Sequence, residues 1–111
     1  RRYMVNEYKI LKQHAGGTSA TTYTVPASTS AIVSSIVVAN RASSAKTFRI
    51  SVFPSGGSGT ADASYLAYDT SIAANDVVTM TLGITLATGE ALQLYGSDTN
   101  VSINAFGTQI T

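Results

Sequence analysis

The stretch Val101-Ser102-Ile103-Asn104-Ala105 alternates apolar side chains with small polar ones. Residues 48–52 and 78–82 repeat this alternation. In an extended chain, successive side chains point to opposite faces, so each run places its apolar side chains on one face and its polar ones on the other. The pattern predicts half-buried β-strands.

Strand patterns of this kind recur from residue 21 to residue 110, and turn-forming residues separate them. The predicted strands are 21–25, 31–39, 46–53, 65–70, 77–82 with 84–86 after Gly83, 90–95 and 101–110. Their number and spacing predict an all-β fold, an antiparallel β-sandwich of the jelly-roll type with seven or eight strands. Gly83 is predicted to mark a bulge or a bend, and Gly107 is predicted to mark a bulge. Apolar residues on both parities of 31–39 predict a strand covered on both faces.

Residues 1–14, RRYMVNEYKILKQH, differ from the rest of the chain. Four basic residues against one acid give this segment a net charge of +3, whereas three basic and five acidic residues give the remainder −2. We expect residues 1–17 to form an arm with a glycine joint, either extended or a short helix over 4–13, and residues 18–111 to form the sandwich. The side chains predicted to contact partners are Tyr3, Val5, Tyr8, Ile10 and Leu11.

The composition is poor in charge and rich in hydroxyl groups. Only 12% of residues are charged, and serine and threonine account for 29 of 111. Little charge repulsion would keep such a surface monomeric, so we expect a homo-oligomer or attachment to a larger body. A net charge of +1 does not favour nucleic-acid binding, and no apolar run approaches the ~20 residues of a membrane span.

Three basic residues, Arg41, Lys46 and Arg49, lie close together in the sequence around one predicted turn. An oligonucleotide-binding barrel would place basic and aromatic residues together on one face, but the predicted sandwich has a net negative charge. We interpret the three as solubilising residues that form salt bridges, and as candidate contacts to a neighbouring subunit.

The sequence offers no convincing catalytic or cofactor site. The chain has no cysteine, and its one histidine, His14, lies beside the glycine joint, so we expect a surface or interface residue there and not a catalytic base. The glycine-rich stretch 54–60 lacks the lysine of a phosphate-binding loop. Asp76 and Asp98 lie in predicted turns, where aspartates bond their own backbone. A calcium ion at residues 97–100 is conceivable, but the spacing of an EF-hand is absent. We therefore predict no enzyme activity, no metal and no cofactor.

Several segments resemble a family of small virion proteins of tailed bacteriophages, cyanophages among them. These are TTYTVPASTSAIVSSIVVANR (21–41), KTFRISVFPSGG (46–57), SYLAYDTSIAANDVVTMTLGITL (64–86), NVSINAFGTQIT (100–111) and the arm NEYKIL (6–11). The resemblance covers residues 6–111 and implies an all-β structural protein of the particle without enzymatic activity. It supplies no catalytic residues to carry over.

The leading prediction is a capsid decoration, or cement, protein on the outer surface of the phage head. It would bind the major capsid protein or other virion proteins, as a trimer, with its arm reaching neighbouring subunits. One alternative is a tail, adaptor or fibre-associated component. Another is a carbohydrate-binding module in which Tyr65, Tyr68 and Tyr95 form a stacking platform, although alternation places Tyr65 and Tyr68 on opposite faces.

Overall fold

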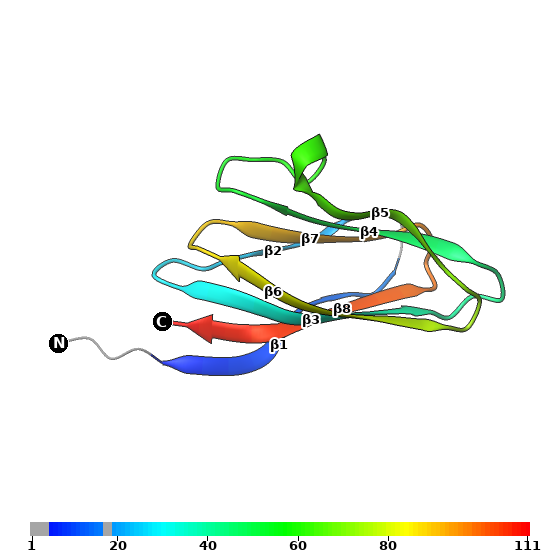
Figure 1. Ribbon diagram of the computed structural model, residues 1–111, viewed down its shortest axis with the longest axis horizontal. Coiled ribbons are helices and arrows are strands. Elements are labelled where there is room, and N and C mark those ends of the chain that lie inside the picture. Colours follow the sequence, from blue (N-terminus) through cyan, green and yellow to red (C-terminus); the bar gives the residue numbers. More distant parts are fainter. Residues whose placement is uncertain (1–4, 17–18) are drawn as a thin grey trace.

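A computed structural model describes residues 5–16 and 19–111, which form two four-stranded antiparallel sheets packed face to face (Figure 1). The strands are β1 (Asn6–His14), β2 (Thr21–Thr24), β3 (Ser30–Asn40), β4 (Lys46–Phe53), β5 (Tyr65–Ile72), β6 (Val77–Leu86), β7 (Ala91–Gly96) and β8 (Val101–Ile110), with one short 3-10 helix, η1 (Asp62–Ser64). The first sheet has the order β1-β8-β3-β6 and the second has the order β2-β7-β4-β5.

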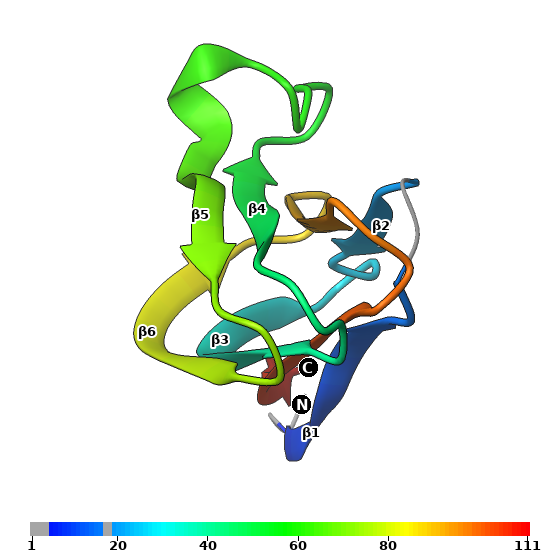
Figure 2. The same cartoon turned by 90° about the vertical axis from the view of Figure 1, so that its right-hand side faces the viewer.

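The chain crosses between the sheets at almost every connection, and only β4 and β5 are consecutive strands within one sheet. Eight strands connected in this way form a jelly roll. The predicted fold class is therefore confirmed. The loop between β4 and β5 carries η1 and stands beyond the sandwich, at the end farthest from β1 in Figure 2.

The core fills the space between the two sheets, and the alternation in the sequence builds it. In β8, Val101, Ile103 and Ala105 are fully buried, whereas Ser102 and Asn104 are half-buried on the outer face. The same alternation operates in the neighbouring strands. The largest fully buried apolar side chains are Phe48, Ile36, Ile50, Ile72, Leu92, Leu94, Ile103, Val33, Val38 and Val101.

Residues 6–14 form an edge strand of the first sheet, so of the two predicted alternatives this segment adopts the extended one and not the helix. β1 pairs with β8 from Asn6↔Ile110 to His14↔Ile103. The ladder with β8 pairs the inner edge of this segment along its length, whereas an isolated helix this short would be marginal in water. Residues 6–14 thus belong to the same sandwich as residues 21–110, although the sequence sets them apart as an arm.

The pairing continues beyond the strand ends and brings the two ends of the described chain together. The Val5 amide donates to the Thr111 carbonyl at 2.9 Å, and the Thr111 amide donates to the Val5 carbonyl at 3.0 Å. Both ends therefore lie at the same corner of the first sheet.

Bulges shift the register in the first sheet, but only one of the two predicted glycines lies in one. Ser34 of β3 lies opposite two residues of β6, Leu82 and Gly83, which confirms the bulge predicted at Gly83. At Gly107 the prediction is wrong, because the extra residue against β8 is Ser34 on β3. Gly107 is needed for close approach instead, since a Cβ there would overlap the carbonyl oxygen of Ile32.

Candidate functional site

The structure places the side chains predicted to contact partners on and beside the edge strand β1. Val5, Tyr8 and Ile10 are exposed, with Tyr8 at 81% of its full accessible surface. Leu11 differs from them, because it is the extra residue of a bulge against β8 and turns into the core. Tyr3 lies outside the described residues. Three of the five predicted side chains are therefore available to a partner.

Tyr8 and Ile10 belong to a wider apolar surface across three strands of the first sheet. Tyr8 lies level with Ile32 of β3, and Ile10 pairs with Phe106 of β8. Ile32 is exposed and Phe106 is half-buried. We call Tyr8, Ile10, Ile32 and Phe106 the apolar face. A shallow hollow of about 500 Å³ lies on it, lined by Tyr8, Lys9, Ile10, Ser34, Phe106, Gly107 and Thr108.

The apolar face explains why β3 carries apolar residues on both parities. The bulge at Ser34 accounts for part of the pattern, because it switches which residues face the core. Odd-numbered residues, Ala31 and Val33, face the core before it, and even-numbered ones, Ile36 and Val38, face the core after it. Ile32 nevertheless points outward and is 36% exposed. The prediction that β3 is covered on both faces is thus wrong for the chain by itself, since the second sheet covers only the inner face.

Arg41 and Lys46, two of the three candidate subunit contacts, make contacts within the chain. Arg41 donates to the Ser102 hydroxyl and to the Thr99 carbonyl, each at 3.0 Å. Lys46 lies 3.7 Å from a carboxylate oxygen of Asp98. The Asn100 amide, and to a smaller extent Lys46, lower the pKa of Asp98 below its usual range. These contacts fix the turn between β7 and β8.

Arg49, the third of these residues, forms the best-defined ion pair of the described chain. Its Nε donates to Asp69 Oδ1 at 2.6 Å and its Nη2 donates to Oδ2 at 3.2 Å. This forked hydrogen bond lowers the pKa of Asp69 and raises that of Arg49. The guanidinium carbon also lies 4.2 Å from the ring centre of Tyr68 and 5.3 Å from that of Tyr95. Arg49 therefore links three strands of the second sheet.

Tyr65 and Tyr68 lie on the same face of the second sheet, so their predicted placement on opposite faces is wrong. The ladder between β4 and β5 shifts by one residue at two points, and strict alternation is lost along β5. Leu66 is the extra residue at one of these shifts and is exposed. The two tyrosine rings meet edge to face, with their centres 4.7 Å apart.

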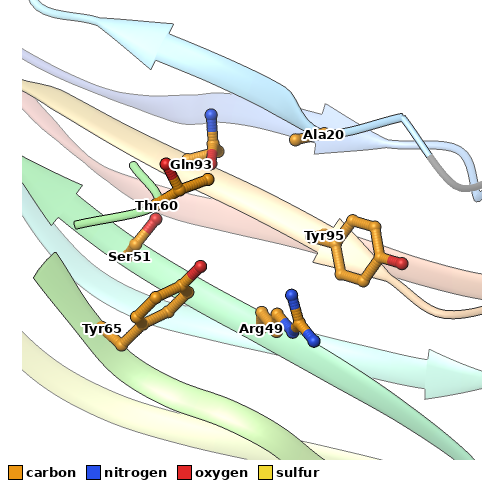
Figure 3. Close-up of a pocket in the computed structure, with 7 residues that line it drawn as sticks. All are labelled: Ala20, Arg49, Ser51, Thr60, Tyr65, Gln93 and Tyr95. Atoms are coloured by element: carbon orange, nitrogen blue, oxygen red, sulfur yellow. The ribbon is translucent and has the colours of Figure 1, made fainter. Parts of the chain in front are cut away.

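A pocket of about 250 Å³ lies on this outer face of the second sheet (Figure 3). We call it the tyrosine pocket. Arg49 and Tyr95 lie toward one end of it, and polar side chains gather beside Tyr65 toward the other. The residues that line it are Ala20, Arg49, Ser51, Thr60, Tyr65, Gln93 and Tyr95, from β4, β5, β7, the β4–β5 loop and the segment before β2.

The polar end of the tyrosine pocket is held in place by neighbouring contacts. Gln93 donates to the Thr22 hydroxyl at 3.3 Å, and the buried Gly59 lies so close that a Cβ there would overlap the Gln93 side chain. The Thr60 amide donates to the Ser58 hydroxyl at 3.2 Å. Ser51 is only 2% exposed. The Thr60 hydroxyl also lies 2.9 Å from the Ser58 hydroxyl, so Thr60 and Gln93 are held in place before any ligand arrives.

His14 is buried, so the prediction of a surface or interface residue is wrong. Only 3% of its surface is exposed, and its Nδ1 lies 2.9 Å from the Thr21 hydroxyl. Because β1 and β2 belong to different sheets, this hydrogen bond joins the two layers. The contact gives His14 a structural position between the sheets.

Asp76 and Asp98 bond backbone amides in turns, as predicted, and Glu90 does the same. Asp76 accepts from the Val77 amide at 2.8 Å, Asp98 accepts from the Asn100 amide at 3.1 Å, and Glu90 accepts from the Ala87 amide at 2.7 Å. Among residues 5–16 and 19–111, no three histidine, cysteine, aspartate or glutamate side chains gather as a metal site would require. Over the same residues, no helix is long and apolar enough to cross a membrane.

We compared the chain with protein-family models, curated proteins and solved structures. No protein-family model and no curated protein matches the chain. A chain in a solved structure of infectious bursal disease virus, Gx strain, is similar to this one, with a TM-score of 0.46 and 14% identity. The match covers 98% of this chain and 33% of the viral chain. A likeness this distant supports no argument about what the present chain does.

Proposed function

We propose that this chain is a non-enzymatic structural protein of a phage virion, a decoration protein that attaches to the outer surface of the head. The observation that carries the proposal is the apolar face on the first sheet. The resemblance to small virion proteins, seen in the sequence, suggests the kind of particle. The jelly roll is used by viral capsid and lectin domains alike, so the fold by itself does not choose between attachment and sugar binding.

The apolar face has the character of a surface that another molecule covers. Its side chains are large and adjoin one another across three strands, and in the single chain Tyr8, Ile10 and Ile32 are exposed while Phe106 is half-buried. Clustered apolar side chains of this kind on a soluble domain mark interaction sites more often than isolated ones do. The partner we propose is the major capsid protein or another protein of the virion.

Attachment through this face would not require the chain to order a flexible arm. Tyr8 and Ile10 are presented by a strand that is already hydrogen-bonded to β8. Burying such side chains contributes at most about 1.5–3 kcal/mol each, and a preformed strand avoids the backbone entropy that an arm would lose on binding. Repeated over many copies, a modest gain per copy would reinforce the head lattice.

The edge strands offer a route to self-association. β1 and β6 are the edges of the first sheet, and an edge strand presents backbone groups to a further strand. We propose a homotrimer at junctions between capsomers, assembled without nucleic acid or membrane. Light scattering coupled to gel filtration measures the oligomer directly, and a monomer at all concentrations would contradict this part of the proposal.

The attachment experiment uses particles that lack the protein and purified chain added back. The double variant Tyr8→Ser, Ile10→Thr should lose attachment while keeping the thermal stability of the parent, because both side chains point to solvent. The matched control is Leu66→Thr, whose side chain is 47% exposed against 49% for Ile10 but lies on the other sheet. Equal attachment by the double variant and the control would refute the role of the apolar face.

A tail, adaptor or fibre-associated role is the second candidate, and the same apolar face could serve it. Quantitative mass spectrometry of purified particles separates the two. Hundreds of copies per particle support decoration of the head lattice, whereas a dozen or fewer support a ring or spike of the tail. Immunogold labelling of intact particles gives the position independently.

A further inference from the structure

We propose that the tyrosine pocket binds one neutral sugar residue, either free or at the end of a glycan. The pocket lies on the outer face of the second sheet, on the opposite side of the sandwich from the apolar face. The inference is therefore independent of the proposed attachment, and either can fail without the other.

Aromatic rings supply the first part of the recognition. Tyr65 and Tyr95 stand on β5 and β7, to either side of the central strand β4, and both line the pocket. The face of an aromatic ring carries negative charge density, which attracts the weakly positive C–H groups on the flat face of a pyranose. Tyrosine also has a hydroxyl that can stay in water or contact the ligand.

Fixed polar groups supply the second part. Ser51, Thr60 and Gln93 place two hydroxyls and an amide at one end of the pocket. These groups both donate and accept, as sugar hydroxyls do, so each can match either role of a ligand hydroxyl. Because Gln93 is already held by Thr22 and the loop at Gly59, little order is lost on binding.

Charge at the pocket favours a neutral ligand over an acidic one. Arg49 is the one cation among the lining residues, and its Nε and Nη2 are engaged by Asp69. The pair carries no net charge, and Asp69 would repel a second carboxylate or a phosphate placed on Arg49. The outer nitrogen, Nη1, points away from the carboxylate in this side-on geometry and can donate to a sugar hydroxyl.

The size of the pocket limits the ligand. Its volume of about 250 Å³ is below the ~300–1,000 Å³ typical of sites that enclose a drug-sized molecule. One sugar residue therefore fits, whereas a nucleotide or a folded peptide does not. A longer glycan would have to extend from the pocket over the exposed Tyr68.

The test begins with NMR titration of the ¹⁵N-labelled chain. The probes are methyl glycosides of glucose, galactose, mannose and N-acetylglucosamine, with N-acetylneuraminic acid as the acidic comparison. At least one neutral glycoside should shift the amide signals of residues 49–51 and 93–95 and should receive saturation transfer from tyrosine ring protons. A neutral and sialylated glycan array then extends the search to larger ligands.

Two variants and one control locate the site. Tyr95→Ala removes one ring and should weaken binding at least about tenfold. Thr60→Trp fills the pocket from an exposed loop position, so it should abolish binding without changing the melting temperature. Val77→Thr changes an exposed apolar side chain of the other sheet, outside the apolar face, and should bind as the parent does.

Three results would overturn the inference. The first is no response to any neutral glycoside and no neutral hit on the array. The second is binding confined to acidic glycans, which would contradict the charge argument. The third is neutral-sugar binding that Thr60→Trp leaves unchanged, which would place the ligand elsewhere.

Discussion

The two outer faces of this sandwich are built from the same kind of strand but differ in what they present. On the first sheet, the pairs Tyr8↔Thr108, Ile10↔Phe106 and Ile32↔Thr108 bring four apolar side chains together, with the bulges at Leu11 and Ser34 directly beside them. On the second sheet, two register shifts between β4 and β5 place Tyr65 and Tyr68 on one face beside the Arg49–Asp69 pair and the tyrosine pocket. The first face thus presents a broad apolar surface, whereas the second presents a polar and aromatic pocket for a small ligand.

We therefore expect the structure of the first face to be sensitive to changes in backbone packing, and that of the second face to changes in charged side chains.

Deleting residues 1–14 should have the largest effect, because it removes β1 from the sandwich. Leu11 and His14 leave the core, and the edge of β8 is uncovered. Truncating one buried leucine costs about 2–5 kcal/mol, so the loss in the free energy of unfolding should be at least this large. Urea denaturation measures it. A deletion with the stability of the parent would show that β1 is a dispensable arm after all.

The substitution Gly107→Ala should have the next largest effect, lowering the free energy of unfolding by about 1–3 kcal/mol through overpacking. The added Cβ would overlap the carbonyl oxygen of Ile32 and press on Leu11, so β8 could not keep its place between β1 and β3. Gly83→Ala is the matched control in the same sheet, because a Cβ there meets nothing within 4 Å. Thermal unfolding of the two variants should differ clearly. Similar melting temperatures would show that the backbone at Gly107 does not need to lie so close to the Ile32 carbonyl.

The substitution Arg49→Lys should cost less stability but should disturb the second face. Lysine keeps the charge, yet it cannot fork onto Asp69 or lie flat against Tyr68. The ring signals of Tyr68 and Tyr95 should shift in NMR spectra, whereas signals from the apolar face should not move. Unchanged tyrosine signals would mean that Arg49 does not organise the pocket.

Acid should produce the smallest effect, and only on the second face. The hydrogen bond from Arg49 lowers the pKa of Asp69 in the folded chain below the ordinary value of about 3.9. The pair therefore contributes its full stabilisation above that value, and the contribution is lost as pH falls through the lower folded pKa. The ¹³C signal of the Asp69 carboxyl gives the midpoint. Because the pair is exposed, the change in stability should be small. A midpoint at or above the ordinary value would contradict the geometry.

Much of the fold could be predicted because apolar and polar residues alternate along a strand that has one face in the core and the other in solvent. The runs at 46–53 and 101–110 match β4 and β8, since each has one face in the core. The sequence does not reveal β1, because Leu11 and His14 are its only buried residues and its charged side chains hide the alternation. An edge strand of this kind is defined by its pairing with β8, whose partner residues lie 89 to 104 positions away in sequence.

The candidate sites were harder to predict, for a related reason. The apolar residues near the N-terminus led to the prediction that Tyr8 and Ile10 contact a partner. Their alignment with Ile32 and Phe106 could not be predicted, because it depends on the order of the strands in the sheet. The tyrosines of the pocket were visible as a group, yet Tyr65 and Tyr68 share a face only because bulges break the period of two. Register shifts of this kind arise from packing between strands, which a single sequence does not display.

The paired ends at Val5 and Thr111 have one more consequence. Because these residues are hydrogen-bonded to each other, a short glycine–serine link could join them and make the backbone a closed ring. Reopening that ring in the exposed loop at 54–58 would give a circular permutant in which β1 follows β8 directly. The strand that now enters the sheet from one end of the chain would become the second half of an ordinary hairpin.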